Sequence, residues 1–164
     1  FTTRDWYRQL MAAIVQEPEG CFSAVTNRIK CPFQVVDNGA HMKNHDITSN
    51  RQLGASLLAE HGSTLLDVTD EPRTPSGFLM CLSKKAWREA GGFPSGYHLM
   101  DKRMWQALKL MGRRLYILKG LYLYHWHRGG GPEADDYLLE APWTKLHTLG
   151  DGRVIGTTQE GVYK

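Results

Sequence analysis

Residues 76–128 decide the predicted fold, and they read SGFLMCLSKKAWREAGGFPSGYHLMDKRMWQALKLMGRRLYILKGLYLYHWHR. The stretch begins with a continuous apolar run over 77–82, which is typical of a strand buried on both faces of a sheet. A short helix, a longer helix and two strand-like runs follow, at 84–90, from Asp101, at 114–118 and at 121–127. This order predicts an α/β fold with polar residues at the ends of its elements, where functional sites are usually built.

Asp101 is the acidic residue at the start of the longer helix. Apolar residues follow it at helical spacing, at Met104, Trp105, Leu108 and Met111. A carboxylate in the first turn can simply accept the free amide hydrogens at the helix N-terminus. The same environment keeps the carboxylate ionised, and an ionised carboxylate facing a cleft can take a proton from a hydroxyl. The residues alone leave both interpretations open.

Two histidines mark the end of the last strand-like run. Alternation along this run places His125 and His127 on the same face as Leu121 and Leu123. Arg128 follows directly and leads into three glycines. Because neutral imidazole is a good metal ligand and Arg suits anionic phosphate, this strand end predicts a ligand-binding position.

The length and composition of the chain predict one domain. Its 164 residues are 41% hydrophobic and 23% charged, which is enough apolar content for an ordinary single-domain core. We therefore assign residues 1–164 to a single domain, with 129–164 as a C-terminal tail. Within the tail, the glycines around Asp151 predict a hairpin turn over 150–152.

Charge, cysteine spacing and hydropathy predict the cellular location of the protein and exclude some classes of partner. The net charge of +3 comes from charges of both signs scattered along the chain, so we expect no nucleic-acid partner. The three cysteines lack CxxC spacing, which argues against a disulfide framework or a four-ligand zinc site and favours a reducing, cytoplasmic location. Apolar runs fall short of the ~18 residues that a membrane-spanning helix needs, so we expect no span.

The residues before position 76 predict supporting elements. These are a helix over 3–16, a strand over 21–25, a helix that starts at Ser49 and stops at Gly62, and a strand over 63–68. His41 and His45 stand four apart with Asp46 beside them, a spacing that would suit a metal on a helix. The nearby Asn38 and Gly39 favour a loop, in which the histidines would be solvated.

Five motifs occur in a fixed order along residues 76–125. They are Ser76-Gly-Phe-Leu-Met, Ala86-Trp-Arg-Glu-Ala-Gly-Gly-Phe-Pro, Asp101, Arg113-Arg-Leu-Tyr-Ile-Leu and Tyr124-His125. This arrangement resembles the second half of a GT-A fold glycosyltransferase of the family 2 type. In that family a glycine-bearing strand precedes a Gly-Gly-Phe-Asp turn, a Glu-Asp pair opens a helix, and a Gly-Tyr-Arg strand and a valine-rich strand ending in His follow.

The resemblance implies a fold and a reaction. The fold would be a partial GT-A, Rossmann-like mixed sheet flanked by helices, with the N-terminal nucleotide-binding half missing. The reaction would transfer a sugar from a UDP- or GDP-type nucleotide-sugar donor to a hydroxyl of a saccharide or other acceptor, with inversion and with a divalent metal, Mn or Mg. The metal would act as a Lewis acid on the departing nucleotide.

The resemblance also implies roles for single residues. Asp101 matches the family's general base, which deprotonates the acceptor hydroxyl, and His125 matches a histidine that helps hold the metal. Gly77, Tyr97, His98 and Arg128 are the residues of the same stretch that we expect to contact substrate. For Asp101 and His125 to serve one reaction, they must face a shared cavity.

The chain departs from the family pattern at several positions. Met100 stands where the family favours Glu, and Pro94 ends the turn where the family has Asp. The Asp-x-Asp metal motif of the family's first half does not precede the stretch, and the helix over 3–16 resembles the one that directly follows that motif. The resemblance therefore implies an upstream segment, or a separate chain, that binds the donor.

Two other functions fit the same residues. A non-catalytic carbohydrate- or protein-binding module would use an aromatic cleft of Tyr97, Trp105 and Trp126. A small metal-binding protein would use His125 and His127 as ligands.

Overall fold

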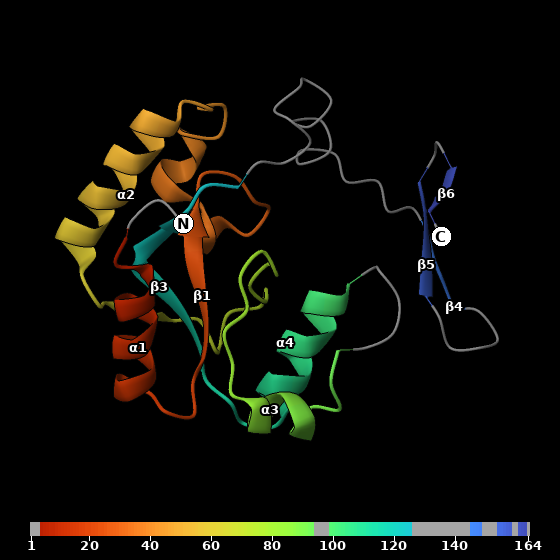
Figure 1. Cartoon of the computed structure of the whole chain (residues 1–164). Helices are drawn as coiled ribbons and strands as arrows, with labels where there is room; N and C mark the ends of the chain where they lie inside the picture. The colour runs from red at the N-terminus through yellow and green to blue at the C-terminus, as the bar shows by residue number, and fades with distance from the viewer. Residues whose placement is uncertain (1–3, 94–98, 126–144, 149–153, 159–160, 164) are drawn as a thin grey trace.

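The computed structural model describes residues 4–93, 99–125, 145–148, 154–158 and 161–163. A three-stranded mixed sheet lies at its centre, with strand order β1-β3-β2 (Figure 1). β1 (Cys21–Thr26) pairs in parallel with β3 (Leu115–Leu123), and β2 (Leu65–Asp67) pairs antiparallel with the other edge of β3. The prediction of an α/β fold with a mixed sheet flanked by helices is thereby confirmed.

Four α-helices and two short 3₁₀ helices surround this sheet in the described part of the chain. They are α1 (Trp6–Gln16), η1 (Pro32–Gln34), η2 (Val36–Gly39), α2 (Ile47–His61), α3 (Lys84–Glu89) and α4 (Met100–Leu110). Farther along, β4 (Lys145–Thr148), β5 (Val154–Thr158) and β6 (Gly161–Tyr163) form a second, antiparallel sheet. β4 and β5 pair as the predicted hairpin requires, and the turn over 150–152 lies outside the described residues.

Local side-chain chemistry sets where two of the helices begin. α2 starts earlier than predicted because the Asp46 carboxylate, and not Ser49, caps it by accepting the Ser49 N–H at 2.6 Å. α3 begins at Lys84, as predicted, and the hydroxyl oxygen of Ser83 caps it by accepting the Ala86 N–H at 3.0 Å. An N-cap side chain thus fixes the first turn of each helix.

The core lies on both faces of the central sheet. On one face, which we call the α1-side cluster, the buried members are Leu10, Ala13, Phe22, Ala24, Tyr116, Leu118 and Leu121. On the other, the α4-side cluster, they are Cys21, Val25, Val36, Val68, Ala86, Met104, Trp105, Leu108, Leu115, Ile117 and Tyr122. Figure 1 shows α1 and α4 on opposite sides of β1. Leu121 and Tyr122 fall in different clusters, which confirms the predicted alternation for this run.

β3 is one strand and not two. Lys119 and Gly120 were expected to separate two strands, but they lie within β3 at an irregularity of its pairing with β1. Ala24 pairs with Leu118 and the next residue, Val25, pairs with Tyr122, so three residues of β3 bulge out of the ladder. Thr26 then pairs with Leu123, where the strand ends.

The apolar run over 77–82 does not form the doubly buried strand that was predicted. Its described backbone bridge to the sheet joins Cys81 and Phe22. The two hydrogen bonds of this bridge have N to O distances of 2.7 and 2.9 Å. Its apolar side chains are half-buried, and Gly77 is exposed. The run lies beside β1 but is held there mainly by side chains of Ser23 and Gln34, so the ladder that defines a strand is absent from it.

Two further findings concern the oxidation state of the cysteines and the length of the described helices. All three cysteines are free thiols, and burial raises the pKa of Cys21 to about 11 and that of Cys31 to about 12. At neutral pH these thiols are protonated. Among the described helices, none has the length and apolar character needed to cross a membrane.

Candidate functional site

The candidate site lies where β1 and β3 end. In parallel strands the carboxyl ends meet at one edge of the sheet, which is where ligands of open α/β sheets bind. β1 ends at Thr26 and β3 at Leu123, so Asn27 and His125 follow their strands at the same edge. α4 precedes β3 and begins with Met100 and Asp101.

Asp101 makes its hydrogen bond to a different segment of the chain. Its Oδ2 accepts the Gly77 N–H at 2.7 Å, across 24 residues of sequence. The N-cap of its own helix is Leu99, which has a φ of 60° and no side-chain capping bond. The hydrogen bond of Oδ2 with Gly77 therefore does not cap its own helix, although the carboxylate lies in the first turn, at the positive end of the helix dipole. A bulky residue in the left-handed region is uncommon, and it lies directly before the helix that carries Asp101.

Gly77 is close to Asp101 because it has no side chain. A Cβ at position 77 would lie 2.2 Å from the Asp101 Cβ and 2.9 Å from its Oδ2. Such separations are far inside van der Waals contact, so any other residue would displace the carboxylate. Gly77 was expected to contact substrate, and in the structure its described partner is Asp101.

His125 is fixed by three contacts. Its backbone N–H donates to Asn27 Oδ1 at 2.8 Å, and its ring Nδ1 lies 2.8 Å from the carbonyl oxygen of Arg28. Because a carbonyl oxygen only accepts, Nδ1 carries the proton, and in the neutral ring Nε2 carries the lone pair. The imidazole also stacks on Phe78, with ring centroids 5.9 Å apart and planes inclined by 28°.

The dipeptide Gly77-Phe78 connects the two principal candidates. Asp101 bonds the backbone of Gly77, and His125 stacks on the side chain of Phe78. α4 packs in the α4-side cluster, whereas Phe78 packs against the α1-side cluster. Asp101 on α4 and His125 after β3 thus contact adjacent residues, but α4 and Phe78 pack on opposite faces of the sheet, so these contacts do not by themselves place the two side chains in one cavity.

The side chains of His41 and His45 have different hydrogen-bond partners. His41 Nε2 lies 3.1 Å from Asp37 Oδ2, and His45 Nδ1 lies 2.7 Å from the Tyr124 hydroxyl. Asp46 caps α2. Both histidines lie outside the helices, as the loop interpretation predicted, but their side chains are half-buried and not fully solvated. Within the described ranges, no three His, Cys, Asp or Glu residues gather as a metal site.

Tyr124, the residue before His125, contacts the loop that carries His45. Burial raises the pKa of the Tyr124 hydroxyl, and the positive charge of Arg28 partly offsets this effect. The neutral hydroxyl can therefore donate to His45 Nδ1 at 2.7 Å. Arg28 itself is buried, with 1% of its surface exposed, so a positive charge lies beneath the end of β3.

The remaining predicted residues have two outcomes. Tyr97, His98 and Arg128 lie outside the described residues, as do Trp126 and His127. Trp105 was predicted to line an aromatic cleft, and this prediction is wrong because its side chain is fully buried in the α4-side cluster. Its position on α4 faces the sheet, where burial of a large apolar ring is favourable.

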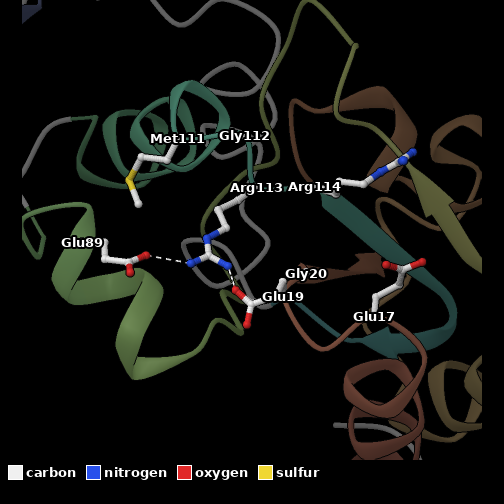
Figure 2. A pocket seen from close by; sticks show the side chains of 8 residues that line it. All are labelled: Glu17, Glu19, Gly20, Glu89, Met111, Gly112, Arg113 and Arg114. Carbon is white, nitrogen blue, oxygen red and sulfur yellow. Dashed lines mark hydrogen bonds and ion pairs between the residues drawn. The ribbon is translucent and has the colours of Figure 1, made fainter.

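A cavity of about 230 Å³ lies at the opposite edge of the sheet. Its walls include Gly20 and Arg114, which directly precede β1 and β3. Arg113 also lines this cavity, and its guanidinium forms ion pairs with both Glu19 and Glu89 (Figure 2). None of the predicted catalytic, metal or substrate residues lines it.

Sequence reasoning missed Gln34 and Phe78 as parts of the site. Gln34 follows Pro32 and Phe33 in an irregular segment, and no motif marks its side chain. Phe78 is one of several apolar residues in a run, so nothing distinguishes it from core packing. Both act through contacts that only the folded chain creates.

Comparison of the chain with models of known protein families, with curated proteins and with solved structures finds no match. Support for a function therefore comes from the sequence motifs and from the geometry at the carboxyl edge of the sheet.

Proposed function

We propose that this chain is the acceptor-side half of a GT-A glycosyltransferase of the family 2 type. It would transfer a sugar from a nucleotide-sugar donor to an acceptor hydroxyl, together with a donor-binding segment. One observation carries the proposal: the two residues with chemical roles in the resemblance, Asp101 and His125, contact the adjacent residues Gly77 and Phe78.

In this proposal Asp101 is the general base. The Gly77 N–H occupies Oδ2, so we assign proton transfer to Oδ1. Oδ1 takes the proton of the acceptor hydroxyl while the acceptor oxygen attacks the anomeric carbon and the bond to the nucleotide breaks. Attack on the face opposite the leaving group inverts the anomeric centre. The bond from Gly77 holds the carboxylate in one orientation, which reduces the entropic cost of reaching the transition state.

His125 would contribute Nε2 to a divalent ion, Mn or Mg. The fit is partial, because His125 is a single ligand and no group of three His, Cys, Asp or Glu residues gathers among the described residues. The other ligands would come from the donor diphosphate, from water and from the donor-binding segment. When bound, the ion would neutralise charge on the departing nucleotide. The Nδ1–H bond to the Arg28 carbonyl fixes the tautomer that such ligation requires.

The decisive experiment measures nucleotide binding and sugar transfer together, in the chain combined with the donor-binding segment that the proposal requires. Thermal stabilisation by UDP or GDP with Mn²⁺ is expected for the wild type and is lost in His125→Ala, because the ion loses a protein ligand. Asp101→Asn should keep this stabilisation but lose roughly 100-fold or more of sugar transfer, because its amide cannot accept the proton. Asp70→Asn is the matched control for the acid, because Asp70 follows β2, which ends opposite Tyr116 near the start of β3. His61→Ala, at the end of α2, is the control for the loss of a histidine.

Two results would count against the enzyme. Stabilisation by UDP or GDP that does not depend on Mn²⁺ or on His125 would favour a binding module. Unchanged transfer in Asp101→Asn would remove Asp101 as the base.

A further inference from the structure

Gln34 is a fully buried polar residue at the side of the candidate site. It ends η1, and none of its surface is exposed. Its Oε1 accepts the Ser76 N–H at 2.6 Å, and its Nε2 donates to Ser23 Oγ at 2.8 Å. The Ser23 hydroxyl in turn donates to the Leu79 carbonyl at 2.8 Å. Two side chains therefore replace the backbone ladder that is missing between β1 and the run over 76–79.

The carboxamide of Gln34 meets both backbone groups of Ser76. Nε2 lies 3.5 Å from the Ser76 carbonyl oxygen, in addition to the bond from the Ser76 N–H to Oε1. The Ser76 carbonyl belongs to the same planar peptide unit as the Gly77 N–H. Gln34 thus lies on the carbonyl side of this peptide, and Asp101, at 2.7 Å from the Gly77 nitrogen, lies on its amide side.

We propose that Gln34 is a positioning residue for Asp101, which it orients through the peptide between Ser76 and Gly77. This inference rests on the proposed function for the role of Asp101, but the orienting contact itself does not. The buried amide holds the Ser76 backbone through the 2.6 Å bond from its N–H and the longer 3.5 Å contact to its carbonyl oxygen, and the peptide after Ser76 carries the N–H that bonds the carboxylate. Because trans peptides are rigid, a rotation at the carbonyl moves the N–H by the same angle.

The chemistry of the contacts requires an amide and not an acid at position 34. The Ser76 N–H needs an acceptor, whereas Ser23 Oγ, the Ala24 carbonyl and the Ser76 carbonyl surround a donor. An ionised glutamate would keep the acceptor but place a second lone-pair atom against these oxygens. Protonation of that glutamate would restore one donor.

Gln34→Glu tests this role by hydrogen exchange. At pH 7 we expect the Gly77 amide to exchange about tenfold faster relative to the Ile117 amide of β3, as the loss of one net hydrogen bond predicts. The excess should shrink as the pH is lowered and the glutamate protonates. Gln9→Glu is the matched control, because Gln9 is also a buried glutamine and lies on α1. It should change both amides equally.

A milder variant guards against loss of folding. Ser23→Ala removes the acceptor of Nε2 and the donor to Leu79, and it should accelerate Gly77 exchange by a smaller factor than Gln34→Glu. In a transfer assay, Gln34→Glu should lower kcat with little change in KM, because the donor contacts remain.

Each outcome bears on a different claim. Equal acceleration of Gly77 and Ile117 in Gln34→Glu would reduce Gln34 to a general stabilising residue and overturn the inference. Selective acceleration in this chain, with no sugar transfer once the donor-binding segment is supplied, would support the positioning contact while the proposed function fails.

Discussion

The contact between Gly77 and Asp101 depends on single atoms. The amide hydrogen of one residue and the carboxylate of the other are in contact only because position 77 has no Cβ. On the other side of the same dipeptide, the ring of Phe78 supports the imidazole of His125. Small changes at these positions are therefore expected to alter chemistry more than stability.

Gly77→Ala tests this expectation directly. Its new methyl group would lie 2.2 Å from the Asp101 Cβ, so the carboxylate must move. A displacement of about 1 Å at a catalytic group costs roughly 100-fold in rate, and we expect a loss of that size in kcat for sugar transfer. Ser76→Ala is the control and should retain activity. Full activity of Gly77→Ala would show that the position of Asp101 is not critical.

Between elements, ion pairs and hydrogen bonds fasten the edges of the sheet. Asp67 ends β2 and lies beside Arg114, which precedes β3. Burial tends to raise the pKa of Asp67, but hydrogen bonds from Thr69 and Arg114 outweigh burial and lower it below its ordinary value. The folded state therefore favours the ionised carboxylate, and its contribution to stability is present above the ordinary pKa near 4.

Asp67→Asn should show this contribution as a pH dependence. The amide keeps an acceptor for Thr69 but loses the charge, so we expect a loss of about 0.5 to 1 kcal/mol in the free energy of unfolding at pH 7. The difference from wild type should close as the pH falls through the lowered pKa of Asp67. Urea unfolding at pH 7 and pH 3 measures both values. A difference that stays constant with pH would contradict this account, and Asp70→Asn serves as the exposed control.

Across the whole described structure, Arg113 joins three parts that are distant in sequence. Its guanidinium pairs with Glu19 in the connection from α1 to β1 and with Glu89 on α3, while its own backbone lies between α4 and β3 (Figure 2). The Arg113 side chain is 12% exposed, whereas that of Arg114 is 63% exposed. The two neighbouring arginines therefore form a natural comparison.

Arg113→Met should cost about 2 kcal/mol of unfolding free energy, since charge-assisted hydrogen bonds of a mostly buried group are lost. Arg114→Met should cost less than about 1 kcal/mol, because its ion pair with Asp67 is exposed to solvent. Chemical denaturation of the two variants checks the order. Equal costs would show that burial of the Arg113 side chain does not strengthen its ion pairs.

Sequence periodicity predicts the local parts of this molecule well. The alternation at Leu121 and Tyr122 and the helical spacing after Asp101 are local patterns, and the structure contains both. The absence of a strand over 77–82 could not be predicted, because strand formation depends on a partner strand that the residues of the run do not specify. The contacts of Gln34 with Ser76 likewise bridge 42 residues and have no local signal.

Gly77 and Asp101 cannot change independently during evolution. A mutation that gives position 77 a side chain displaces the Asp101 carboxylate. A mutation that replaces Asp101 by a smaller residue removes the need for glycine at position 77. Homologous sequences should therefore show these two alignment columns covarying. A lineage that has lost glycine at 77 while keeping aspartate at 101 would have rebuilt the surrounding backbone.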